Sequence, residues 1–275
     1  VNKLLTNNKS NEEDFIHDDS IEDIRKLVDI LQRFPLAIRQ ATAHINYHRE
    51  VRQFSINNYI DEYNFRKKEY LDSKYFQMGI GTKYGETTYT TWRVTISAIE
   101  KNPSVGNLAL RILRIIAYFE ADHIRRDIFF HLNDPSTDNK IVEGDIISAV
   151  QLLVKYSMIE GRKRQSVLSI HRLVQSVMKI HLENKDTSRA ALHDGLNILH
   201  KMLKQQNGED ASQTFEHGMS VFLSILEKED LAKEFSLLSL IVLEQAFDCG
   251  KLQQCMYFGD VVSKDTITIE AAIGI

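Results

Sequence analysis

The sequence contains little glycine and very little proline: 12 Gly and 3 Pro in 275 residues. Collagen-like chains and Gly/Pro-rich disordered chains need far more of both, so these two classes are excluded. The same scarcity leaves few residues for the tight turns of a β-rich fold. Leu and Ile recur instead between Lys, Glu and Gln, a pattern typical of amphipathic helices. We therefore expect a mainly α protein.

The sequence also has few cysteines and a small net charge. Cys249 and Cys255 are the two cysteines, which is too few for a disulfide framework, and they lack the C-x-x-C spacing of zinc and redox motifs. The 34 basic and 38 acidic side chains give a net charge of −4. Such a balance does not demand nucleic acid or a membrane surface as a partner. These features favour a cytoplasmic protein with reduced thiols.

Long apolar runs are absent as well. Residues 237–243 form the longest one in the C-terminal third, and Ser239 interrupts it, so it falls far short of the ~20 residues that cross a bilayer. The sequence starts at Val1, shows no signal peptide, and ends without a helix stop signal. We expect a piece of a longer protein, with no membrane partner.

Hydrophobic periodicity divides the chain into four regions. Residues 1–20 are a polar loop or linker, and residues 21–90 form a helical subdomain. In that subdomain we expect one helix over 21–33, capped by Ser20, and a second over 35–47 that begins at Pro35, because proline suits the first position of a helix. Gly79, Gly81 and Gly85 mark a loop beyond them.

Residues 91–185 fit the pattern of a winged-helix domain. The spacing predicts helices over 91–100, 105–119, 124–132 and about 146–154. Two short strands over 158–162 and 166–170 flank a basic turn, and a further helix covers 171–182. Residues 186–275 are helical again and resemble the start of a tetratricopeptide-like array.

Three segments in order carry a family resemblance. Residues 34–41, Phe-Pro-Leu-Ala-Ile-Arg-Gln-Ala, resemble the GLPLAL-x-x-A motif of NB-ARC domains in STAND-type signalling NTPases. Residues 168–175, Leu-Ser-Ile-His-Arg-Leu-Val-Gln, resemble the HRLVQ version of that family's MHD motif. Between them, residues 92–113 are similar to the family's entry into its winged-helix domain. The resemblance covers about residues 20–185.

The resemblance implies a nucleotide-dependent switch. Pro35 would lie against the adenine, and His171 would contact the β-phosphate of ADP and hold the switch closed, since a histidine donor beside phosphate gives a charge-assisted hydrogen bond. A protein ligand sensed by the helical array would release that contact and lead to homo-oligomerisation. The nucleotide-binding domain upstream in the same chain would be the partner of this segment.

Two departures from the family pattern bear on that function. Arg33 and Phe34 replace the usual Gly-Leu before the proline, so the tight glycine turn is not secured. No segment matches G-x-x-x-x-G-K-[ST], the loop whose amides and lysine hold phosphates, and no strand ends in a Walker-B acidic pair. We expect that this fragment is not an enzyme and binds no cofactor alone, with ADP or ATP and magnesium held only in the intact protein.

Simpler interpretations remain open at both predicted nucleotide contacts. Pro35 would start a helix in any helical protein, and His171 would cap the helix that follows the second wing strand. Under these interpretations the chain is a helical protein–protein interaction scaffold. A third alternative, DNA binding, needs basic residues on the recognition helix, where Glu143 and Asp145 stand against Lys155. We therefore expect no DNA partner.

No candidate catalytic or metal-binding segment matches its motif completely. His44 and His48 are one helical turn apart, but Ile45 stands where H-E-x-x-H requires Glu, so we interpret both as surface histidines. The three glycines of residues 79–85 miss the dinucleotide fingerprint by one residue. We expect no catalytic residue and no metal ligand in this fragment.

Overall fold

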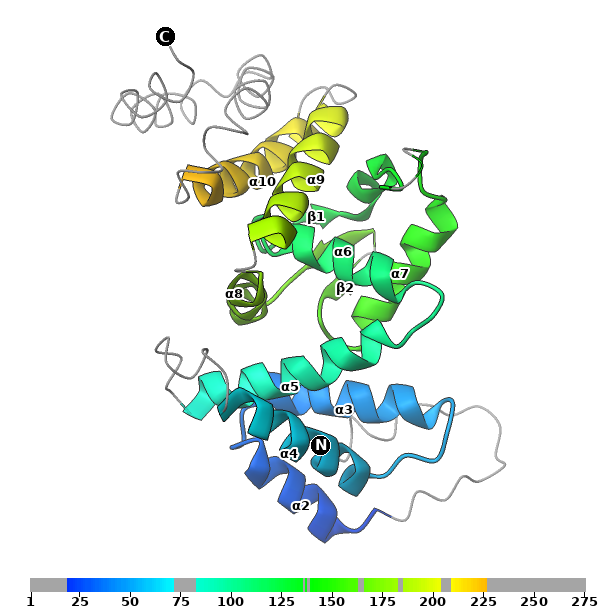
Figure 1. Ribbon diagram of the computed structural model, residues 1–275, viewed down its shortest axis with the longest axis vertical. Coiled ribbons are helices and arrows are strands. Elements are labelled where there is room, and N and C mark those ends of the chain that lie inside the picture. The colour runs from blue at the N-terminus through cyan, green and yellow to red at the C-terminus, as the bar shows by residue number, and fades with distance from the viewer. Residues whose placement is uncertain are drawn as a thin grey trace. The chain divides into compact units, whose positions relative to one another are not determined.

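The computed structural model describes residues 19–71, 83–135, 137, 139–162, 166–182, 185–203 and 209–226. These residues are mainly helical, as predicted (Figure 1). The chain divides into two compact units, one of residues 1–110 with 151–159 and the other of residues 111–150 with 160–275. Within the described ranges, no helix is both long and apolar enough to cross a bilayer.

The first unit is built on four helices: α2 (Ile21–Ile30), α3 (Pro35–Arg49), α4 (Ile56–Leu71) and α5 (Lys83–Glu100). Ser20 caps α2 as predicted: its hydroxyl accepts from the Asp23 N–H at 3.1 Å, and the Asp23 carboxylate accepts from the Ser20 N–H at 2.9 Å. Pro35 is the first residue of α3, also as predicted. The sequence signals for both helix starts are therefore confirmed.

An apolar cluster joins the helices of the first unit. It joins side chains of all four helices with Phe54 from the α3–α4 connection; its members are Leu27, Leu31, Ala37, Ala41, Ile45, Phe54, Ile56, Tyr59, Ile60, Tyr63 and Val94. Asp19, just before α2, contacts both ends of the α3–α4 connection. Its carboxylate pairs with Arg49 and accepts the Ile56 N–H at 3.0 Å. The connection from α3 to α4 is thereby tied to the start of α2.

The second unit combines helices with a small three-stranded sheet. Its elements are α6 (Gly106–Ile116), β1 (Ile124–Arg125), the 3₁₀ helix η2 (Arg126–His131), α7 (Glu143–Lys155), β2 (Glu160–Arg162), β3 (Val167–Ser169) and α8 (Arg172–His181). Residues of α6 and α7 are shared between the two units. The strands pair antiparallel in the order β1-β3-β2, with Leu168 opposite both Ile124 and Gly161.

Two local predictions are wrong. Residues 124–132 do not form one helix, because Ile124 and Arg125 pair with β3 and only the following residues turn, as a 3₁₀ helix. Gly85 does not lie in a loop but inside α5, where it is buried. Gly79 and Gly81 fall outside the described residues, as does the centre of the basic turn at 163–165.

Two further helices follow in the second unit. Helices α9 (Lys185–Leu203) and α10 (Glu209–Leu226) pack against each other (Figure 1). Arg111 of α6 holds α9 through a two-pronged ion pair with Asp194, with both nitrogen–oxygen distances at 2.7 Å. The remainder of the predicted array, from residue 227 onward, lies outside the described residues.

Candidate functional site

The turn before Pro35 has a backbone conformation that glycine prefers. Gln32 and Arg33 have φ values of 54° and 57°, in the left-handed region that L-residues adopt at a cost. The Arg33 N–H closes α2 by donating to the Val28 carbonyl at 2.9 Å. The turn therefore forms without the family's glycine, and it leaves Pro35 exposed at the start of α3.

His171 stands at the other predicted contact, as the N-cap of α8. Its Nδ1 accepts a hydrogen bond from the Leu173 N–H at 3.2 Å, and the residue is exposed. In the neutral ring one nitrogen accepts and the other carries the proton, so this bond places the proton on Nε2. The capping interpretation of His171 is confirmed, and an N–H donor remains on the ring.

The other residues of the HRLVQ segment have structural partners. Ile170 donates its N–H to the Ala121 carbonyl at 2.8 Å, and Arg172 pairs with Glu120 at 2.9 Å. The Gln175 amide, buried at 9% exposure, donates to the carbonyls of Ile116 and Phe119 at 3.1 and 2.9 Å. The role of Gln175 was missed from the sequence, because both its partners are more than 50 residues away in the chain.

Pro35 belongs to the first compact unit and His171 to the second. Both are exposed and both lie at the first turn of a helix. At such positions free backbone N–H groups and the helix dipole favour anions.

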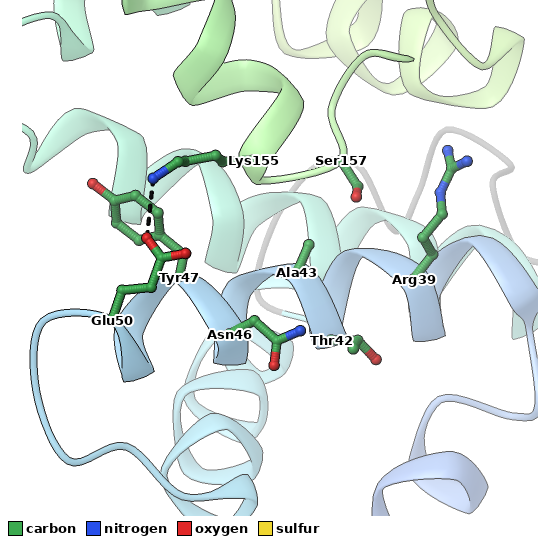
Figure 2. Close-up of a pocket in the computed structure, with 8 residues that line it drawn as sticks. All are labelled: Arg39, Thr42, Ala43, Asn46, Tyr47, Glu50, Lys155 and Ser157. Carbon is green, nitrogen blue, oxygen red and sulfur yellow. Dashed lines mark hydrogen bonds and ion pairs between the residues drawn. The ribbon is translucent and has the colours of Figure 1, made fainter. Parts of the chain in front are cut away.

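A hollow lies along α3, one turn beyond Pro35. It has a volume of about 240 Å³, and side chains of α3 and of the end of α7 line it, among them Arg39, Asn46 and Ser157 (Figure 2). At its far end Lys155 pairs with Glu50 at 3.0 Å. Ligand pockets for drug-sized molecules start at roughly 300 Å³, so the hollow is too small to take a whole nucleotide.

The two histidines of α3 are not both surface residues, which corrects the sequence interpretation. His44 is fully buried, and its Nε2 lies 3.2 Å from the Glu62 carboxylate. Burial, with His44 and Arg52 nearby, lowers the pKa of His48 to about 4. Burial alone would raise the pKa of Glu62, but its contact with His44 holds the value below the usual one. Across the described residues no group of three His, Cys, Asp or Glu is placed to hold a metal ion.

The face of α7 gives no support to DNA binding. Glu143 and Asp145 occupy its first turn, and Lys155 is the basic residue of its last turn. Lys155 is already paired with Glu50. A recognition helix needs free basic or amide side chains for base edges and phosphates.

Two comparisons with known proteins found a similarity. Residues 102–187, from before α6 to the start of α9, match a family described as a domain of unknown function, DUF7779. The chain is 28% identical over 177 residues to a protein of Hyaloscypha variabilis named "Nucleotide-binding leucine-rich repeat (NLR)-like protein"; the alignment covers 62% of this chain. The chain spans 16% of the length of that relative. No solved structure matches the chain. The chain is thus distantly similar to an NLR-like protein.

Proposed function

We propose that the chain is a regulatory segment of a STAND-type signalling ATPase. In the intact protein His171 and the turn at Pro35 would hold ADP against a nucleotide-binding core that this sequence lacks. The NLR-like relative supports the class of protein. The element order α6-β1-η2-α7-β2-β3 supports the winged-helix domain in which such switches carry their histidine.

The geometry of His171 is the observation that carries the proposal. Folding uses Nδ1 of the ring for the cap, and Nε2 keeps its proton on an exposed side chain. A phosphate oxygen that approaches the start of α8 would meet this N–H together with the positive end of the helix dipole. Both interactions favour the same anion, so an ADP phosphate fits this position.

The proposed switch is regulatory and not catalytic in this segment. A protein ligand bound by the C-terminal helices would favour a state in which His171 no longer contacts ADP. The ligand shifts the equilibrium only by its difference in affinity between the two states. Nucleotide exchange and homo-oligomerisation would follow, and hydrolysis would require the P-loop of the missing core.

Replacing His171 by Ser in the intact protein tests the proposal. Serine keeps an oxygen that caps α8, so the fold stays intact, but it removes the imidazole donor. We expect the purified variant to retain at least tenfold less ADP and to show higher basal signalling, since a charge-assisted hydrogen bond contributes about 1.5–3 kcal/mol. Chromatography of the released nucleotide gives the measurement.

His193→Ala is the matched control, because His193 is an exposed histidine of α9 in the same unit. It should retain ADP like the unchanged protein. If the His171 variant keeps its ADP and its basal signalling, the switch proposal fails. The chain would then be better described as a helical interaction scaffold in which His171 serves the fold alone.

A further inference from the structure

One short segment, residues 116–121, anchors the start of α8. Its backbone and side chains provide every partner described above for Ile170, Arg172 and Gln175. His171 stands among these three residues. The position of the histidine is therefore fixed by the chain that leaves the end of α6.

Gln175 is the buried part of this anchor. The carbonyl of Ile116, the last residue of α6, accepts the Phe119 N–H at 3.2 Å. The Gln175 amide donates to the same carbonyl and to that of Phe119, three residues beyond the helix. Buried carbonyls left without a donor cost stability. One side chain therefore joins the end of α6 to the first turn of α8.

The C-terminal helices contact the same segment from another direction. The His217 ring of α10 stacks on Phe119, with ring centroids 5.2 Å apart and an angle of 16° between the planes. Gly195 of α9 faces the same ring: a Cβ added there would lie 3.4 Å from it. Tyr118 and Ser188 share a buried hydrogen bond of 2.7 Å.

Phe119 consequently takes part in both sets of contacts. Its carbonyl accepts the hydrogen bond from Gln175, and its ring stacks on that of His217. The Phe119 ring is buried and lies against both His217 and Phe129, which leaves it little room to rotate. We therefore expect a displacement of α10 to move the carbonyl that holds Gln175 along with the ring. We propose that Gln175 is a positioning residue for His171, and that α10 acts on this anchor through His217 and Phe119. The relevance of this to nucleotide release depends on the function proposed above.

Amide hydrogen exchange of the chain itself tests the anchor without nucleotide. Gln175→Met preserves the shape of the side chain and removes the donor, and Gln175→Glu places a carboxylate against the two carbonyls. We expect the N–H groups of Ile170 and Leu173 to exchange on the order of tenfold faster in both variants, with the larger effect for Glu.

Val150→Ala is the control for a general loss of stability, because Val150 is a buried residue of α7 outside the anchor. It should speed exchange across the unit without singling out Ile170 and Leu173. If the Gln175 variants raise exchange only as uniformly as Val150→Ala does, Gln175 is a core residue and does not position His171.

A double-mutant cycle tests the link to α10. His217→Ala should speed exchange at Ile170 and Leu173 several-fold, whereas His217→Phe, which keeps the stacked ring, should not. When combined with Gln175→Met, His217→Ala should add little, since the anchor is already lost. Independent, additive effects or an unchanged exchange in His217→Ala would overturn the link.

In the intact protein the same variants separate the two proposals. If His171→Ser leaves ADP binding unchanged, the function proposed for His171 is wrong, yet the exchange results still decide whether the anchor exists. If His171→Ser releases ADP and Gln175→Met does not, the nucleotide contact stands and the positioning role of Gln175 falls.

Discussion

At the scale of single residues, Arg33 has a backbone conformation that glycine adopts at lower cost. Arg33 occupies the place of the usual glycine and adopts the left-handed φ of 57°. The sequence shows that glycine is missing there, but it does not show whether the turn survives. It forms because the Arg33 N–H still closes α2 onto Val28, although Gln32 and Arg33 are both left-handed and each such residue costs roughly 1–2 kcal/mol.

Arg33→Gly should therefore stabilise the first unit. We expect Arg33→Gly to be about 1 kcal/mol more stable than Arg33→Ala, since Ala keeps the strained Cβ. Comparing these two variants cancels the loss of the exposed Arg33–Asp29 pair, whose atoms lie 3.2 Å apart. Urea unfolding followed by circular dichroism measures the difference; equal midpoints would show that the left-handed turn carries no strain.

At the scale of elements, periodicity predicted the helices well and the long-range contacts poorly. The helices expected over 21–33 and 35–47 are α2 and α3, with ends that differ by a few residues. The strand β1 was missed because two residues are too few to show alternation, and its conformation comes from pairing with β3. Likewise, no local pattern indicates that Gln175 reaches carbonyls 56 and 59 residues back in the chain.

The candidate site was predictable in its helix starts but not in the burial of its side chains. Helix starts at Pro35 and after His171 follow from local rules, and both are present. The burial of His44 was not predictable, because it depends on Glu62 and on aromatic rings of other elements. Contacts between distant residues, which decide burial, have no periodic signature in the sequence.

An ion pair between Arg111 and Asp194 joins α6 to α9. Arg111 and Asp194 are each 19% exposed and meet in a two-pronged geometry. We expect a double-mutant cycle with Arg111→Ala and Asp194→Ala to give a coupling energy of about 1–3 kcal/mol, between the values for exposed and buried pairs. Thermal unfolding measures all four proteins of the cycle.

The Arg172–Glu120 pair provides a comparison, because its arginine is 79% exposed. Its cycle should give less than about 1 kcal/mol, since solvent screens such a charge. If the two cycles give the same coupling energy, the burial of Arg111 and Asp194 does not strengthen their pair.

At the scale of the whole molecule, each compact unit contains, among its described residues, a histidine whose pKa burial lowers to about 4. These are His48 in the first unit and His217 in the second unit. Near His217 the His123 carbonyl and Glu120 favour the proton, but burial outweighs them. Unfolding returns both groups to an ordinary pKa of about 6.5.

Stability should therefore fall on acidification. Between pH 6.5 and 4 the unfolded chain binds more protons than the folded chain, so the free energy of unfolding decreases as pH falls. At pH 5 the loss relative to pH 7 is about 2 kcal/mol for His217, and about half that for His48 once screening at its half-exposed ring is included.

Urea unfolding at a series of pH values measures this dependence. His217→Phe keeps a ring against Phe119 and removes the titrating group, so its stability should decrease less between pH 7 and 5 than that of the unchanged chain. A parallel decrease in both proteins would show that His217 does not account for the acid sensitivity.

The cap on α8 has a consequence for natural variation among related sequences. Ser, Thr, Asp and Asn cap helices at least as well as histidine does, so folding alone leaves position 171 open to any of them. Drift restricted only by the cap would scatter these four residues through relatives that share the segment. If histidine is instead retained at position 171 in these relatives, selection acts on the imidazole for a reason other than capping α8.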